Sequence, residues 1–213
     1  MEALFTLDRP TKTLFDAAGR RFAATERKWL GGSRRKGSGK SEMIDAIGAV
    51  AWLQRESGSP LREPIGVIGP REANAAQLAA ALEVGELLGD CRLTVLCGGR
   101  QGVMQAVCEG VARVGGLSIG LLPEADASPA NPFVDVAIAT GIGEARNALI
   151  ARASFCLIAI GNSLGTLSEV ALGLHFGKRV IGLEHAADLA GVRHVASARA
   201  AVAAVAEAIL VPS

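Results

Sequence analysis

Aromatic residues are scarce in this 213-residue chain, which contains six Phe, two Trp and no Tyr. A buried core must then consist mainly of Ala, Val, Leu and Ile, and these residues suit helices that pack closely on a sheet. Hydrophobic residues make up 50% of the chain, and its length suits one globular domain with an extension. The composition therefore favours an α/β fold over a β-sandwich.

The chain also lacks an excess of charge of one sign, because it contains 22 Lys and Arg residues and 21 Asp and Glu residues. A nucleic-acid-binding surface or a polybasic membrane anchor depends on a basic excess. Glycine or charge interrupts every apolar run before it reaches the length that spans a bilayer. We therefore expect a cytoplasmic protein with no membrane partner, and the charge balance argues against a nucleic-acid partner.

Metal-ligand spacing is missing from the cysteines and histidines. No CxxC pair occurs among the four cysteines, which are Cys91, Cys97, Cys108 and Cys156. The three histidines stand far apart in predicted structure; they are His175, His185 and His194. We therefore read the thiols as reduced core residues, predict no metal site, and expect that folding requires no cofactor.

Residues 1–63 differ in pattern from the rest of the chain, and we expect them to form an N-terminal extension. Apolar alternation over 11–15 and 20–24 predicts a β-hairpin. The pair Ser41-Glu42 is typical of a helix start, so a helix is predicted from there to about Ser57. The extension is therefore expected to contain one hairpin and one helix.

The loop over 31–40 is rich in Gly, Ser and basic residues. Its end, Gly37-Ser-Gly-Lys-Ser41, is similar to the end of a phosphate-binding P-loop. The first glycine of a P-loop would stand at position 34, which is Arg34, and no strand precedes it. We therefore predict a solvated loop here and no nucleotide triphosphate site.

Residues 64–213 alternate regularly between short apolar strands and helices, which indicates βαβ units and a parallel sheet. Strands are predicted over 65–68, 93–97, 118–122, 134–139, 155–160, 180–183 and 192–195. Helices are predicted over 74–88, 102–114, 143–153, 164–176 and 198–210. In the first helix, Leu78, Leu82 and Leu88 are expected to form the buried stripe. The pattern predicts a Rossmann-like α/β domain, an open parallel sheet of about seven strands flanked by helices.

Three strands of this domain end in turns that contain glycine. The turn residues singled out as ligand-binding are Gly69, Gly98, Gly99, Gly102, Gly161, Ser163, Gly165 and Thr166. The carboxyl ends of parallel strands face one crevice, and ligands bind there. Glycine lets the backbone approach a phosphate, and the start of the next helix offers unpaired N–H groups. We therefore predict that a phosphate-bearing ligand binds at this edge of the sheet.

Two charged residues join this crevice from successive βα units. Arg146 stands early in the helix predicted over 143–153, and Glu169 follows Thr166 by one helical turn. An Arg can hold a phosphate or carboxylate with two hydrogen bonds. A Glu can bind ribose hydroxyls or stabilise positive charge that develops on a sugar. The alternative interpretation is a plain surface ion pair.

Four motifs in residues 64–210 together resemble the LOG-like superfamily, whose members were once labelled lysine decarboxylases. The motifs are Cys97-Gly-Gly-Arg-Gln-Gly-Val-Met104, Asn131-Pro-Phe-Val-Asp135, Gly143-Glu-Ala-Arg-Asn147 and Gly165-Thr-Leu-Ser-Glu169. The sequences of these motifs are most similar to those of the branch that contains the molybdenum cofactor carrier proteins. The resemblance implies a carrier or storage protein for that cofactor, with Asn147 among the ligand-binding residues. It also implies a homodimer or homotetramer.

The sister branch supplies the alternative function, a phosphoribohydrolase that cleaves nucleoside 5′-monophosphates with Arg146 and Glu169 as catalytic residues. That branch has Pro-Gly-Gly where this chain has Gly161-Asn-Ser163, and a Lys where this chain has Asn147. These differences narrow the phosphate nest and remove a charge. A lysine decarboxylase is excluded, because a Schiff-base lysine is required and Lys178 precedes a strand at its amino end.

The superfamily fold also resembles the single-stranded-DNA-binding domain of DNA processing protein A. Binding of a single strand depends on a basic groove with stacking aromatic residues. After position 64 the aromatic residues are Phe133, Phe155 and Phe176, and the charge is balanced. The ligand expected from the sequence is therefore the molybdenum cofactor or a nucleoside monophosphate.

Overall fold

The computed structural model describes residues 4–31 and 41–211, and these form two compact units. The first unit comprises the described residues within 1–61 and 203–213, and the second unit comprises residues 62–202. The end of the chain belongs with the first unit in part through Trp29, whose indole Nε1 donates a hydrogen bond to the Leu210 carbonyl at 2.8 Å. Most of the basic loop, residues 32–40, lies outside the described residues.

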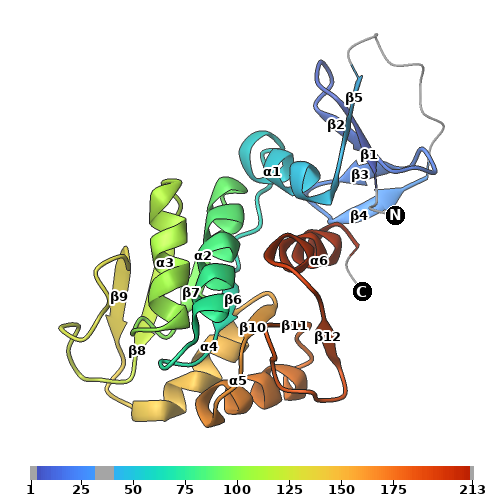
Figure 1. Ribbon diagram of the computed structural model, residues 1–213. Coiled ribbons are helices and arrows are strands. Elements are labelled where there is room, and N and C mark those ends of the chain that lie inside the picture. Colours follow the sequence, from blue (N-terminus) through green and yellow to red (C-terminus); the bar gives the residue numbers. More distant parts are fainter. Residues whose placement is uncertain (1–3, 32–40, 212–213) are drawn as a thin grey trace. The chain divides into compact units, whose positions relative to one another are not determined.

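A sheet of seven parallel strands confirms the predicted Rossmann-like fold (Figure 1). The strands are β6 (Ile65–Ile68), β7 (Val95–Cys97), β8 (Ser118–Leu122), β9 (Val136–Ala139), β10 (Leu157–Ile160), β11 (Val180–Leu183) and β12 (Val192–His194). Their order in the sheet is β12-β11-β10-β6-β7-β8-β9. All four residues of β6, of β10 and of β11 are buried, as expected for strands covered on both faces.

The chain leaves β6 towards β7, β8 and β9, and then returns to place β10 on the other side of β6. The order of strands therefore reverses between β6 and β10. In an open parallel sheet, the carboxyl ends of the strands form a crevice at such a reversal. The turns after β6 and β10 begin with Gly69 and Gly161, so the topology places two of the predicted glycine turns beside this crevice.

The helices of this unit follow the strands closely. They are α2 (Ala75–Asp90), α3 (Val103–Arg113), the 3₁₀ helix η1 (Gly143–Arg146), α4 (Asn147–Ala153) and α5 (Leu164–His175). The last helix, α6 (Ala198–Leu210), begins in this unit, and its residues from Ala203 onward belong to the other unit. Helix α2 packs against α3, and α4 packs against α5. Asn74 begins α2 with a capping box in which its side chain accepts from the Gln77 N–H at 2.9 Å.

The prediction that Leu78 lies on the buried face of α2 is wrong. Leu78 is 37% exposed, and the buried face of the helix contains Ala81, Val84, Gly85 and Leu88. A side chain at Gly85 would overlap with the backbone of α3. Small residues therefore let α2 and α3 approach closely, and the packing partner rather than residue size selects the buried face.

The first unit holds an antiparallel sheet of five strands in the order β4-β3-β2-β1-β5. These strands are β1 (Phe5–Asp8), β2 (Thr13–Phe15), β3 (Arg21–Ala23), β4 (Lys28–Leu30) and β5 (Ser41–Ile44). The pairing of β2 with β3 confirms the predicted hairpin. The helix start predicted at Ser41 is wrong, because residues 41–44 pair with β1 and α1 (Ala46–Glu56) begins after Asp45. Asp45 accepts from the Gly48 N–H at 2.8 Å, and this cap fixes the start of the helix.

Five of the eight Phe and Trp residues of the chain lie in this smaller unit. The rings of Phe5 and Trp29 stack with centroids 5.7 Å apart, and Phe22 contacts Trp29 at 5.0 Å with tilted planes. Phe5 and Phe22 are buried, as is Trp52 on α1. Aromatic rings thus supply apolar area to a small unit, while aliphatic side chains build the core of the larger unit.

Among residues 4–31 and 41–211, no helix has the length and apolar character needed to cross a membrane. The described residues also contain no group of three or more His, Cys, Asp or Glu side chains that could hold a metal ion. All four cysteines are buried and free, as predicted.

Candidate functional site

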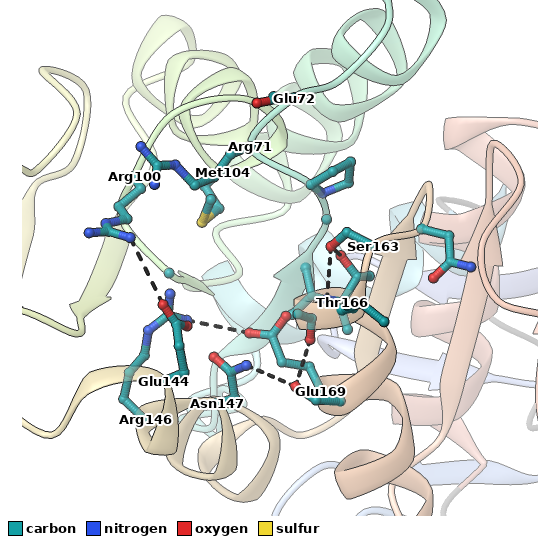
Figure 2. Close-up of a pocket in the computed structure, with 18 residues that line it drawn as sticks. Arg71, Glu72, Arg100, Met104, Glu144, Arg146, Asn147, Ser163, Thr166 and Glu169 are labelled. Carbon is teal, nitrogen blue, oxygen red and sulfur yellow. Dashed lines mark hydrogen bonds and ion pairs between the residues drawn. The ribbon is translucent and has the colours of Figure 1, made fainter.

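A cavity of about 680 Å³ lies at the carboxyl ends of the parallel strands (Figure 2). Its walls come from the turns after β6, β7 and β10, from η1 with the start of α4, and from the first two turns of α5. This volume is typical of a site for a small organic ligand. The cavity therefore occupies the position that the order of the strands predicts.

Most of the site residues predicted from the sequence line this cavity. They are Gly69, Gly98, Arg146, Asn147, Ser163, Gly165, Thr166 and Glu169. The structure thus brings together turns and charges that are separated by up to 100 positions in the chain. Whether these residues bind a ligand stays a prediction.

Three of the predicted glycines do not line the cavity. Gly99, Gly102 and Gly161 have φ angles of +72°, +71° and +70°, a conformation that other residues rarely adopt. A side chain at Gly102 would overlap with the Arg71 carbonyl, and one at Gly161 would overlap with Gln77. These glycines shape the turns that carry the lining residues.

The start of α5 forms one end of the cavity. Ser163 is the N-cap and accepts from the Thr166 N–H at 3.1 Å, and the two hydroxyl oxygens lie 2.9 Å apart. A Cβ atom at Gly165 would meet only Ser163 Oγ, at 3.8 Å, so the space beside this helix start is open. Unpaired N–H groups and the helix dipole make this position favourable for an anion.

Arg146 is buried in the cavity wall with 5% of its surface exposed. Its Nη1 lies 3.4 Å from Glu169 Oε1, which is longer than the 2.7–2.9 Å of a strong charge-assisted hydrogen bond. A Cβ atom at Gly98 would come within 2.7 Å of both Nη atoms, so the glycine makes room for the guanidinium. Arg146 Nε has no hydrogen-bond partner among the described residues. Arg146 lines the cavity and carries more N–H donors on its Nη atoms than the contact with Glu169 uses.

Burial raises the pKa of Glu169 from its ordinary value of 4.5 to about 8. Burial is the largest cause; the charge of Arg146 opposes it, and the charge of Glu144 adds to it. The loose contact with Arg146 explains why the ion pair does not offset the loss of hydration. Burial therefore favours the protonated form of Glu169, a carboxyl group that can donate a hydrogen bond.

Asn147 links α4 to α5 inside the same wall. Its Nδ2 donates to Ser168 Oγ at 2.9 Å, and Ser168 Oγ donates to the Gly165 carbonyl at 2.7 Å. Asn147 is 5% exposed, and its Oδ1 has no hydrogen-bond partner among the described residues. The amide thus braces the first turn of α5 and leaves one acceptor unused.

The opposite wall of the cavity contains residues that were not predicted from the sequence. Figure 2 shows Arg71, Arg100 and Met104 across the cavity from Ser163 and Thr166. Arg100 forms an ion pair with Glu124, and its Nη1 lies 4.0 Å from Glu144 Oε1. The position of Arg100 inside the turn from Cys97 to Gly102 was an available signal, because that turn follows a strand end.

The segment from Asn131 to Asp135 supports the site from outside it. Asn131 is buried, and its Nδ2 donates to the carbonyls of Gly99 and Arg100, each at 3.1 Å. Asp135 Oδ2 accepts from the backbone N–H of Ser118 at 2.7 Å and from its hydroxyl at 2.8 Å. These two side chains fix the turn after β7 and the start of β8, so their role is structural.

The parallel sheet and its cavity define a Rossmann-type domain with a crevice at the carboxyl ends of its strands. Residues 62–209 match the SLOG cluster4 family, which covers well over half of the chain. The chain therefore belongs to this family. An uncharacterized protein of Archaeoglobus fulgidus is 40% identical over 129 residues, which are 61% of this chain and 85% of that protein.

Solved structures similar to this chain include molybdenum cofactor proteins. The molybdenum cofactor binding protein from Rippkaea orientalis is 36% identical with a TM-score of 0.67, over 70% of this chain and 99% of that one. The molybdenum cofactor carrier protein of Chlamydomonas reinhardtii is 33% identical with a TM-score of 0.63, again over 70% and 99%. These matches confirm the resemblance that the motifs indicated.

DNA processing protein A from Streptococcus pneumoniae is similar at a greater distance. It is 18% identical with a TM-score of 0.54, and the match covers 66% of this chain and 60% of that one. At this identity the likeness shows a shared fold alone.

Proposed function

We propose that the cavity binds a phosphate-bearing, nucleotide-like ligand, and that the ligand is the molybdenum cofactor, which the protein carries or stores. The observation that carries this proposal is the placement of the buried Arg146 guanidinium and the open start of α5 in one cavity. The relatives from Rippkaea orientalis and Chlamydomonas reinhardtii, named for this cofactor, support the identity of the ligand.

The phosphate of the ligand occupies the end of the cavity beside Gly165 and Thr166. There it meets the N–H groups of the α5 start, while Arg146 supplies a positive charge. A cavity of about 680 Å³ leaves room beside the phosphate for a ring system. The apolar lining residues Pro70, Met104 and Leu164 are available to contact that ring.

The second candidate function is a nucleoside monophosphate phosphoribohydrolase, which the contact between Arg146 and Glu169 favours. Such an enzyme stabilises an oxocarbenium-like transition state with a negative carboxylate. Burial raises the pKa of Glu169 to about 8 and so favours the protonated form, which lacks that charge. We therefore propose binding without turnover. Free adenine released from AMP by the parent protein, but not by Glu169→Gln, would establish the enzyme instead.

Native mass spectrometry of protein purified from cells that make the molybdenum cofactor tests the carrier proposal. The parent should retain a molecule of the cofactor's mass, and Gly165→Asp should not, because its carboxylate enters the space for the phosphate. Gly31→Asp is the matched control, since a Cβ there meets nothing within 4 Å. Equal retention by parent and Gly165→Asp would refute the site. The same spectra test the predicted dimer or tetramer.

A further inference from the structure

Arg100 lies on the wall of the cavity opposite the start of α5, and its neighbours hold it in place from two sides. Its carbonyl accepts a hydrogen bond from Asn131 Nδ2 at 3.1 Å. Its Nη2 forms an ion pair with Glu124, whose side chain is 23% exposed. Glu124 is fixed in turn, because its carbonyl accepts from the Gly141 N–H at 2.8 Å. The protein itself therefore fixes the position of the Arg100 side chain.

The other Nη atom of Arg100 makes a long contact. Nη1 lies 4.0 Å from Glu144 Oε1, which is longer than a hydrogen bond. The Glu144 side chain is 71% exposed, and water weakens an ion pair at such a position. Both residues line the cavity, and Figure 2 shows the contact between them. An oxyanion that enters the cavity can therefore replace Glu144 as a partner of Nη1, which carries two N–H donors.

Arg71 adds positive charge to the same wall. It is exposed and lines the cavity. Its Nη2 donates to Gln101 Oε1 at 3.4 Å, and its side chain has no carboxylate partner among residues 4–31 and 41–211. Glu72 also lines the cavity, and in the same part of the chain no ion pair joins it to either arginine. This wall thus holds two guanidinium groups, and the start of α5 lies across the cavity from them.

We propose that Arg100, with the charge of Arg71, forms a second oxyanion subsite in the cavity, and that Glu144 competes with the ligand for it. The proposal rests on the proposed function, in which a phosphate occupies the start of α5. The two subsites come from opposite walls, so a ligand that fills both carries two anionic groups. Arg100 is then a binding residue that favours such a ligand over one with a single phosphate, and Glu124 is its positioning residue.

Crystals soaked in a concentration series of sodium tungstate test this proposal, because the anomalous signal of tungsten locates a tetrahedral oxyanion. The parent should show two peaks in the cavity, one at the start of α5 and one beside Arg100. Arg100→Gln should lose the second peak and keep the first. Glu144→Gln should reach half occupancy beside Arg100 at about threefold lower tungstate concentration, because it removes an exposed ion pair. Glu83→Gln removes an exposed carboxylate outside the cavity and should match the parent.

The peak at the start of α5 separates this proposal from the proposed function. A peak there with none beside Arg100, in both the parent and Glu144→Gln, would overturn the second subsite and leave the proposed function in place. A peak beside Arg100 that persists in Arg100→Gln is an adventitious ion only and would overturn the subsite too. Absence of tungstate from the start of α5 would reject the phosphate site of the proposed function. If circular dichroism shows that Arg100→Gln is unfolded, Glu144→Gln decides alone, since occupancy equal to that of the parent would refute the competition.

Discussion

Replacing Glu169 by glutamine should remove a pH dependence of stability from this protein. The Glu169 carboxyl has a pKa of about 8 in the folded protein, against an ordinary value of 4.5. The folded state therefore holds the proton more tightly than the unfolded state does. Its contribution to stability is complete below about pH 4.5 and declines as the pH rises towards 8. Glutamine imitates the protonated carboxyl at every pH.

The magnitude follows from the linkage between proton binding and folding. With these two pKa values, the contribution of Glu169 to the free energy of unfolding falls by about 2 kcal/mol between about pH 6 and about pH 8. The difference between Glu169→Gln and the parent should therefore shift by that amount in favour of the variant. Every other titratable group is present in both proteins, so its contribution cancels in this difference.

Urea unfolding followed by far-ultraviolet circular dichroism is the suitable measurement. Tryptophan fluorescence would report on the wrong unit, because Trp29 and Trp52 both lie in residues 1–61. Glu83→Gln, at an exposed position on α2, controls for the loss of a surface carboxylate. If Glu169→Gln and the parent show the same pH dependence, Glu169 is ionised in the folded protein and the reasoning is wrong.

Two further substitutions probe the support of the site. Gly98→Ala should weaken binding of a phosphate monoester about tenfold in titration calorimetry with the fold intact, because the new methyl group displaces the Arg146 guanidinium. Unchanged affinity would show that Arg146 does not contact the ligand. Asp135→Ala should lower the free energy of unfolding by about 2 kcal/mol in urea, because the buried donors of Ser118 lose their acceptor. Asp126→Ala, at an exposed position, is its control, and equal effects of the two would contradict this account.

The predicted site was partly visible in the sequence, since glycine turns after apolar strands have a local signature. The turns at Gly69, Gly98 and Gly165 were found in this way, and all three line the cavity. Arg71 and the orientation of the Asn147 amide were not visible. A side chain's place in a cavity depends on the elements that surround it, and no local pattern records those neighbours.

The extension shows where local signals fail. Ser41-Glu42 has the composition of a helix start, yet residues 41–44 form a strand because β1 is available as a partner. Strands of three or four residues, such as β4, carry too few positions for a clear alternation. The first unit was consequently harder to predict than the regular βαβ segment.

The sequence by itself determined the fold class, the positions of most strands and helices after residue 64, and the glycine turns, because these follow from hydrophobic period and backbone geometry over short stretches. Tertiary structure alone decided which residues share the cavity, the raised pKa of Glu169 and the unpaired oxygen of Asn147. These properties arise from burial and from contacts between distant segments, which exist only after the chain has folded.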